Sequence, residues 1–272
     1  MMKILKKSTQ IIAILLILFF LSFLLLGCKP KMHEEGYFTY YYHHSTDDII
    51  ISELTELGRQ QKVLVIPEEI NGTKVTALSK WTFTMWDAGL VWESENLEKI
   101  FFQTSRLSVG GNTFDDCINL KRVILLDYDP SITIIGGGVR YAVRGDCYIQ
   151  KSNYDYVEDA RVNKNDYYDI KPANITYYYN YIANDSVWYW IDDVDYGEKI
   201  EYIPEDPSRE EYEFGGWYKE AECINKWDFE TDTLPEEQLE EVEVEATLHE
   251  EAYTEIRQVY QETKLYAKWI KE

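Results

Sequence analysis

The sequence predicts a mainly β protein that is built as a short repeat solenoid followed by a small second module. Runs rich in aromatic and β-branched residues occur in both halves, for example Tyr37–His44 and Ile175–Ile182, and these favour strands. A pattern of apolar and turn residues recurs from Leu97 to Leu120, at an interval of 23 residues, which is typical of repeat proteins. No long stretch has a clean helical period before the acidic segment near Leu234.

The chain begins with an apolar leader. Lys3, Lys6 and Lys7 precede an apolar run from Ile11 to Leu26, which is the layout of a secretory signal. This run is shorter than the roughly 20 apolar residues that a spanning helix needs. It is also slightly longer than the usual signal core, so an uncleaved membrane anchor remains the alternative.

The leader ends in Leu25-Leu26-Gly27-Cys28, which resembles the lipobox of bacterial lipoproteins. The resemblance implies that residues 1–27 are a signal peptide, that cleavage falls before Cys28, and that its thiol carries the lipid. Each buried methylene of an acyl chain contributes about 0.8 kcal/mol, so several chains hold a protein stably at a membrane. We therefore expect a protein anchored at the extracytoplasmic face of the cell membrane, with residues 28–36 as a tether.

The composition is strongly acidic, with a formal net charge of −22 for the full chain. The leader contains three lysines and no acid, so the mature chain keeps 24 of the 27 basic residues and all 49 acidic ones, a charge of −25. Such a charge repels nucleic acid and anionic lipid headgroups, so we expect no nucleic-acid partner and no membrane contact beyond the anchor. A solvated acidic surface is the simplest interpretation, although it could also attract cations or basic partners.

Three cysteines follow Cys28, namely Cys117, Cys147 and Cys223. An odd number outside the cytosol argues against a disulfide framework, and buried free thiols are the favoured state, although one pair could form. There is no Cys-x-x-Cys pair and no Cys/His knuckle, so the sequence has no zinc signature.

The first module, residues 37–150, contains the repeated pattern. "VTALSKWTF" ends at Phe83 and "LSVGGNTF" ends at Phe114, and each is followed by an Asn-Leu-x-x-Ile or Asn-Leu-x-x-Val strand. We expect both phenylalanines to fill the layer between turns of the solenoid, and a degenerate third copy to begin at Ile132–Val139. The side chains expected to point inward are Leu97, Ile100, Leu120 and Val123.

An entry unit is predicted at Val63–Val75, as a strand, an Ile-Pro step, an Asn-Gly turn and a second strand, with residues 37–58 as a cap. This region resembles the BspA-like leucine-rich-repeat family. The resemblance implies a short leucine-rich-repeat solenoid and a packing role for Cys117. The residues that carry it are Val65-Ile66-Pro67, Ile70-Asn71-Gly72, Val75, Phe83 and Phe114-Asp115-Asp116-Cys117-Ile118-Asn119-Leu120.

A longer loop, Thr84–Glu95, departs from the repeat pattern and contains Trp86 and Trp92. An exposed tryptophan there could stack on a sugar or anchor a protein partner, which makes both residues candidate ligand contacts. The alternative is that both side chains fold back over the edge of the solenoid, because tryptophan is usually largely buried.

Residues 151–172 are polar and end at Pro172, which predicts a linker before a second module at residues 173–272. In the second module we expect a turn at Gly197 and a backbone bend at Gly215-Gly216. Its core is expected to contain four aromatic side chains, those of Trp217, Trp227, Phe229 and Trp269.

The second module resembles the Listeria–Bacteroides repeat, also called the internalin B-repeat. The resemblance implies a compact β-grasp-like module of bacterial surface proteins. An acidic insertion, residues 231–262, departs from it, and Pro235–Gln261 is expected to form either an amphipathic helix or a partly disordered loop. The matching residues are Tyr196-Gly197, Pro204, Pro207, Tyr212, Phe214-Gly215-Gly216-Trp217-Tyr218, Trp227-Asp228-Phe229 and Leu265-Tyr266-Ala267-Lys268-Trp269.

The sequence contains no catalytic motif. The segments that start at His33 and His249 begin like a zinc-protease helix, but each has tyrosine where the second histidine is required. Asp192, Asp193 and Asp195 lack the spacing of a calcium loop. We therefore expect no enzyme, no cofactor and no metal.

Together these features predict a cell-surface lipoprotein whose repeat modules bind a protein or glycan of a host or neighbouring cell without covalent chemistry, as an adhesin does. The alternative is a structural spacer or envelope-assembly protein with no dedicated ligand. An enzyme or a solute receptor is the least expected class, because the repeats do not provide two lobes around a cleft.

Overall fold

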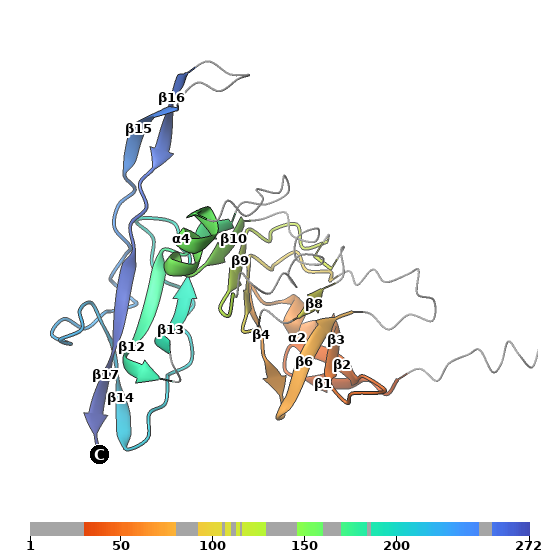
Figure 1. The fold of residues 1–272 in the computed structure, drawn as a ribbon. Helices are drawn as coiled ribbons and strands as arrows, with labels where there is room; N and C mark the ends of the chain where they lie inside the picture. The colour runs from red at the N-terminus through yellow and green to blue at the C-terminus, as the bar shows by residue number, and fades with distance from the viewer. Residues whose placement is uncertain are drawn as a thin grey trace, which may run out of the picture.

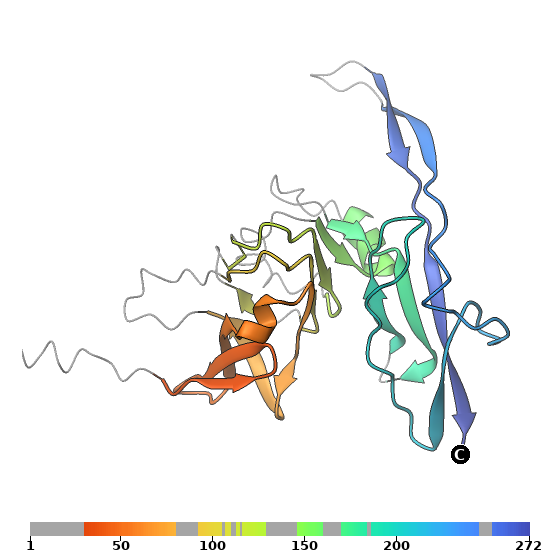
Figure 2. The same cartoon turned by 180° about the vertical axis from the view of Figure 1, so that it is seen from behind.

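The computed structural model describes residues 30–79, 92–104, 107–109, 113–114, 116–128, 146–159, 170–183, 186–244 and 252–272. This part of the chain is mainly β, as predicted. The first module and the C-terminal module lie side by side, and a hairpin projects from the C-terminal one (Figure 1, Figure 2). Cys28, Phe83, Trp86 and the expected third repeat copy lie outside the described residues.

The first module contains two sheets. One has the strand order β1-β2-β3-β6-β5, with β8 beside β6, and the other is a parallel sheet of order β11-β10-β9-β7-β4. The strands of the first sheet are β1 (His33–Glu35), β2 (Phe38–Tyr42), β3 (Ile49–Leu54), β5 (Glu69–Ile70), β6 (Thr73–Leu78) and β8 (Ser108–Val109). The parallel strands are β4 (Val63–Ile66), β7 (Lys99–Phe102), β9 (Arg122–Leu125), β10 (Asp146–Ile149) and β11 (Ile170–Pro172), and a short helix, α2 (Glu56–Arg59), follows β3.

The predicted entry unit is present. β5 and β6 form an antiparallel hairpin whose two turn residues are Asn71, with φ of 52°, and Gly72, with φ of 76°. Two successive residues with positive φ match the twist of the flanking strands, and the Asn-Gly pair is favoured there because asparagine and glycine tolerate that conformation.

The apolar core of the first module lies between its two sheets. Leu97, Ile100, Leu120 and Val123 are all buried, and so is Phe114, as the repeat pattern predicted. Cys117 is buried beside them, and its thiol donates to the carbonyl oxygen of Trp92 at 3.2 Å. Cys117 therefore has the packing role that was expected of it.

The prediction that residues 151–172 form a linker is wrong for Lys151–Asp159 and Ile170–Pro172, which form a helix and a strand. Residues 151–172 include a helix, α4 (Lys151–Asp159), and the strand β11, which pairs in parallel with β10. Tyr154 of α4 packs against the core of the first module. The proline that suggested a boundary is accommodated because β11 is an edge strand, where a residue without an N–H leaves no ladder bond unmade.

The C-terminal module is a four-stranded sheet of order β13-β12-β17-β14. The two central strands, β12 and β17, are parallel, and each outer strand is antiparallel to its neighbour. The strands are β12 (Ile175–Ala183), β13 (Ser186–Asp192), β14 (Tyr212–Tyr218) and β17 (Thr263–Lys271).

The predicted bend in β14 is a register shift between Phe214 and Trp217. Gly216 has φ of 102°, a conformation that is strained for any residue with a side chain, which is why glycine is favoured there. Trp217 and Trp227 are buried, while Phe229 and Trp269 are half-buried and pack against the same cluster. The four aromatic residues therefore converge as expected.

In its described residues, the acidic insertion forms neither the amphipathic helix nor the partly disordered loop that the sequence predicted. It contains an antiparallel hairpin of β15 (Leu239–Val244) and β16 (Tyr253–Gln258), which extends away from the sheet (Figure 1). A helix would stack glutamates three and four residues apart on one side, where like charges repel. A strand separates them onto two faces and suits the valines that alternate with them.

Candidate functional site

The two modules share a second apolar core. Ile100 and Phe102 of β7 point into the core of the first module, whereas Phe101 between them points to the opposite face of the parallel sheet. Strands β9 and β10 alternate in the same way and contribute Ile124 and Tyr148 to that face. The C-terminal module covers it, so this face is not open to solvent.

The shared core is dense in aromatic rings. Phe101 is fully buried, and its ring centroid lies 5.0 Å from that of Trp190 on β13 and 4.9 Å from that of Tyr202. Ile175, Leu265 and Trp217 of the C-terminal sheet belong to the same cluster. Apolar burial of this kind is the main favourable contribution to holding two modules in one orientation.

Ion pairs border the shared core. Lys99 Nζ lies 2.6 Å from Asp192 Oδ1, and Arg122 Nε lies 2.8 Å from Asp193 Oδ2. Arg122 also reaches Asp195, with Nη2 2.5 Å from Oδ1. The acidic residues at the end of β13 and directly after it, which the sequence suggested only as an incomplete calcium loop, therefore pair with Lys99 and Arg122 at the starts of β7 and β9.

Burial raises the pKa of Asp193 to about 6, because desolvation of the carboxyl outweighs its attraction to Arg122. Burial also raises the pKa of Asp192, with the nearby charge of Lys99 opposing the change. The short distances indicate ion pairs at neutral pH, whereas the raised pKa values mean that forming them costs desolvation energy. We therefore expect these pairs to contribute more to the alignment of the modules than to net stability.

The raised pKa of Asp193 predicts a stability that falls as the pH rises. The carboxyl loses its proton near pH 4 in the unfolded chain but only near pH 6 in the folded one, so the folded state binds more protons between these values. We expect the free energy of unfolding to fall by on the order of 2 kcal/mol across this interval through this group, and to level off above it. Urea unfolding at a series of pH values measures the effect.

The Asp193→Asn variant removes that titration and is expected to show a shallower pH dependence than the parent protein. Asp195→Asn is the matched control, because it removes the other carboxylate that pairs with Arg122, from a side chain that is 75% exposed. Equal slopes in the parent and Asp193→Asn would contradict the prediction.

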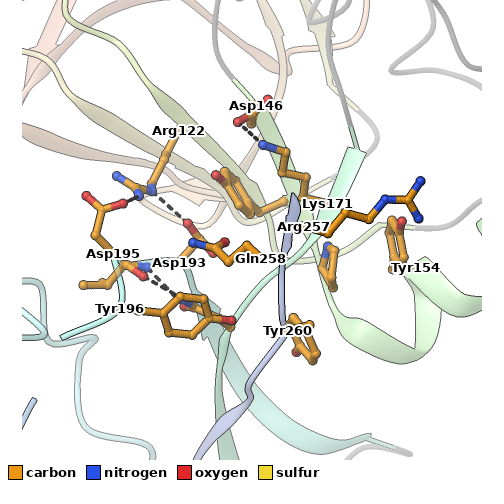
Figure 3. Close-up of a pocket in the computed structure, with 14 residues that line it drawn as sticks. Arg122, Asp146, Tyr154, Lys171, Asp193, Asp195, Tyr196, Arg257, Gln258 and Tyr260 are labelled. Carbon is orange, nitrogen blue, oxygen red and sulfur yellow. Dashed lines mark hydrogen bonds and ion pairs between the residues drawn. The ribbon is translucent and has the colours of Figure 1, made fainter. Parts of the chain in front are cut away.

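The N-terminal ends of β9 and β10 open into a pocket of about 730 Å³, which we call the ion-pair pocket (Figure 3). Figure 3 shows Arg122 between Asp193 and Asp195, and Lys171 beside Asp146. The other residues that line it are Tyr148, Tyr154, Pro172, Asn174, Val194, Tyr196, Arg257, Gln258 and Tyr260. Three cations and three carboxylates face the pocket, so its lining carries no formal net charge.

Many polar groups of the ion-pair pocket already bind one another or the backbone. Lys171 Nζ lies 2.7 Å from Asp146 Oδ2, and the Tyr260 hydroxyl donates to the carbonyl of Ala173 at 2.8 Å. The amide of Asn174 both donates to and accepts from the backbone of Val194. These three interactions each lie within one module, whereas the ion pairs of Arg122 with Asp193 and Asp195 join the two modules. Together they leave few groups for a ligand.

A smaller pocket of about 330 Å³ lies at the other end of the shared core, where β4 and β7 finish. We call it the aromatic pocket. Val65, Pro67 and Gln103 line it from the first module, and Tyr189, Trp190, Tyr202 and Glu205 line it from the C-terminal module. The rings of Trp190 and Tyr202 lie 6.1 Å apart at an angle of 31°. Among the described residues, the buried indole N–H of Trp190 has no hydrogen-bond acceptor.

Sequence reasoning missed the aromatic pocket, although one signal was available. Val187–Trp190 puts tryptophan or tyrosine at three successive positions of β13, which indicates that both faces of this strand are covered. The partner residue Gln103 could not have been found, because it comes from a segment about 90 residues away in the chain.

The candidate contact at Trp92 is corrected by the structure. Its side chain is 1% exposed, and its ring lies 5.5 Å from that of Phe114 and 6.1 Å from that of Phe38. Trp92 is a core residue with no surface for a ligand, which is the alternative that its size favoured. Trp86 and Cys28 lie outside the described residues.

The three described cysteines are free, in agreement with the expectation from their odd number. Burial raises the pKa of both Cys117 and Cys147 to about 12, so these thiols stay protonated and unreactive. In the described part of the chain, no group of three or more His, Cys, Asp or Glu side chains is arranged to hold a metal ion. No helix within the described ranges has the length and apolar character to cross a membrane.

Comparison with known families identifies part of the chain. Residues 174–240 match the model of the Listeria-Bacteroides repeat domain, which confirms the repeat predicted in the C-terminal module. This is a cell-surface repeat domain, so the match is consistent with a surface protein. The match ends before β17, although β17 is a central strand of the sheet. Neither the curated proteins nor the solved structures contain a significant match.

Proposed function

We propose that this protein is a lipid-anchored cell-surface protein that binds an extracellular glycan or protein non-covalently at the junction of its two modules. The observation that carries the proposal is the aromatic pocket, to which both modules contribute side chains. Concave sites with aromatic walls and a few polar groups, located between domains, are where ligands preferentially bind. The match of residues 174–240 to a surface repeat supports display outside the cell.

The first module is proposed to be a BspA-like leucine-rich-repeat solenoid. Ile100 of β7 pairs with Val123 of β9, and these are equivalent positions of the two repeats. Parallel pairing of equivalent residues is what a solenoid requires, and it supports this interpretation. The C-terminal sheet supports a β-grasp-like interpretation of the second module, because its first and last strands are parallel neighbours at the centre.

Attachment is proposed through acyl chains on Cys28, with residues 28–36 as the tether. The acidic mature chain would be repelled by anionic headgroups, so both modules would stand clear of the membrane surface. Processing tests this part of the proposal. The parent protein should partition into detergent, whereas Cys28→Ala should accumulate as unprocessed precursor. Normal processing of that variant, or a lipid-free full-length parent chain in the cytosol, would exclude the anchor.

A structural spacer is the second candidate function. It is favoured by the ion-pair pocket, where Arg122 of the first module pairs with Asp193 and Asp195 of the C-terminal module. Other polar groups of this pocket already bind within their own module. A rigid connection without a ligand would suit a protein that holds a distance from the membrane. The experiment that separates the two functions is a binding screen.

Cells that display the full-length protein should be tested against arrays of glycans and extracellular matrix proteins, with cells lacking it as the control. Saturable binding of at least one ligand supports the binding function. Absence of binding at every position of both arrays would contradict it and leave the spacer as the better account.

A further inference from the structure

We propose that the aromatic pocket binds one uncharged saccharide ring, a proposal that rests on the binding function above and names its ligand class. The pocket volume of about 330 Å³ lies at the lower end of the range for small-molecule sites. A site of this size suits a monosaccharide or a single residue of a larger glycan.

The walls of the pocket suit the apolar face of a sugar ring. Trp190 and Tyr202 present large rings that are fixed from behind by Phe101. Tyr189 packs against Trp217 on the C-terminal sheet and its hydroxyl donates to the carbonyl of Glu205 at 2.8 Å, which holds the segment that closes the pocket. Rings held in this way lose little further conformational entropy when a ligand binds.

The polar groups of the pocket suit hydroxyls, which both donate and accept. Burying the Trp190 N–H without an acceptor costs about 1–3 kcal/mol. This N–H is covered in the unliganded protein, so a ligand oxygen removes that cost by displacing the Trp190 side chain slightly as it enters. The side-chain oxygen of Gln103 accepts from the backbone N–H of Glu68 at 3.3 Å, so its NH₂ group is oriented as a second donor. The exposed carboxylate of Glu205 is an acceptor.

The charges around the pocket favour an uncharged sugar over two other classes of ligand, acidic sugars and quaternary ammonium compounds. Glu205 and the neighbouring Asp206 disfavour an acidic sugar by like-charge repulsion. A quaternary ammonium group would suit the rings and the carboxylate, but it offers no acceptor to the Trp190 N–H. An uncharged sugar satisfies the rings, the two donors and the carboxylate together.

The test uses the protein as it is purified from cell membranes in detergent. Glucose, galactose, mannose, N-acetylglucosamine, glucuronic acid and choline are titrated separately, with saturation-transfer NMR and tryptophan fluorescence as readouts. At least one uncharged sugar should bind saturably, whereas glucuronic acid and choline should not. If choline binds and no sugar does, or if none of the six compounds binds, the saccharide proposal is overturned.

Three variants locate the site. Trp190→Phe keeps a ring but removes the N–H, Gln103→Ala removes the second donor, and Glu205→Ala removes the acceptor. Each should weaken binding about tenfold, since each loses roughly one hydrogen bond to a neutral ligand. Glu201→Ala, an exposed position on the same segment, is the matched control and should bind like the parent protein. Thermal unfolding of all four confirms that they are folded.

The outcomes also separate this proposal from the broader one. If the arrays show a ligand and its binding survives in Trp190→Phe and Gln103→Ala, the saccharide site and the location of binding at the aromatic pocket are both wrong, while a binding function at the cell surface stands. If the parent protein binds nothing on the arrays and none of the sugars, both proposals fail.

Discussion

Replacing Phe101 with alanine is expected to lower the free energy of unfolding by about 3–5 kcal/mol, the usual cost of deleting a buried phenylalanine side chain. Phe101 is fully buried between the parallel sheet and the C-terminal module, against Trp190 and Tyr202. Alanine would leave a cavity that these large rings cannot easily fill. Guanidinium unfolding of the full chain, followed by circular dichroism and tryptophan fluorescence, measures the loss.

The same experiment tests whether the modules fold as one unit. Because Phe101 belongs to the first module and its neighbours to the second, both spectroscopic signals should shift together in Phe101→Ala. Ile118→Ala is the matched control, since Ile118 is in the same module but is 70% exposed, and it should change the free energy by less than about 0.5 kcal/mol. Two separate transitions in the parent protein would show that the shared core does not couple the modules.

Replacing Lys99 with methionine is expected to cost about 3–5 kcal/mol at pH 7, because it leaves a buried carboxylate without its partner. The Asp192 side chain is 1% exposed and that of Lys99 is 13% exposed, so water cannot substitute for the lost ammonium group. Methionine retains most of the aliphatic length of lysine, which limits the contribution of lost packing. Chemical unfolding at pH 7 measures the effect.

Two further variants make this prediction specific to the buried pair. Lys62→Met removes a lysine whose side chain is 68% exposed and whose partner is Glu98, and it should change stability by less than about 1 kcal/mol. In Lys99→Met with Asp192→Leu, no buried charge is left alone, so much of the lost stability should return. A double variant no more stable than Lys99→Met would refute the explanation by an unpaired charge.

Local patterns in the sequence predicted much of the first module. Leu97, Ile100, Leu120 and Val123 are buried as their matching spacing in the sequence predicted, and Ile100 pairs with Val123 on neighbouring parallel strands. The Asn71-Gly72 turn follows from the backbone preferences of those two residues. The strand pattern and the turn each depend on residues that are close in the chain, which is why one sequence was enough to predict them.

Predictions that relied on composition were less successful. Residues 151–172 are polar, yet they include α4 and the edge strand β11, whose pairing depends on a neighbouring strand. The acidic insertion was expected to be a helix or a disordered loop because its charge dominated the pattern. In the described residues, the alternation of Glu240–Val244 matters more, and it gives a strand.

For the candidate site, too, the sequence could not reveal contacts between residues that are distant in the chain. Trp86 and Trp92 were selected because they lie in a long loop, but the structure buries Trp92 against Phe38 and Phe114. The groups that line the aromatic pocket come from strand ends of two modules, and Gln103 and Trp190 have no pattern in common. A pocket formed by distant segments leaves no local signature.

By itself, the sequence determined the mainly β class, the buried apolar positions of the first module, the aromatic core of the second and its relationship to a surface repeat. Only the tertiary structure decided that the outer face of the parallel sheet is covered, that Asp192 and Asp193 bind Lys99 and Arg122, and where the pockets open. The reason is physical: turns and strand alternation arise from interactions between near neighbours, whereas the burial of one module against another depends on surfaces that exist only after both have folded.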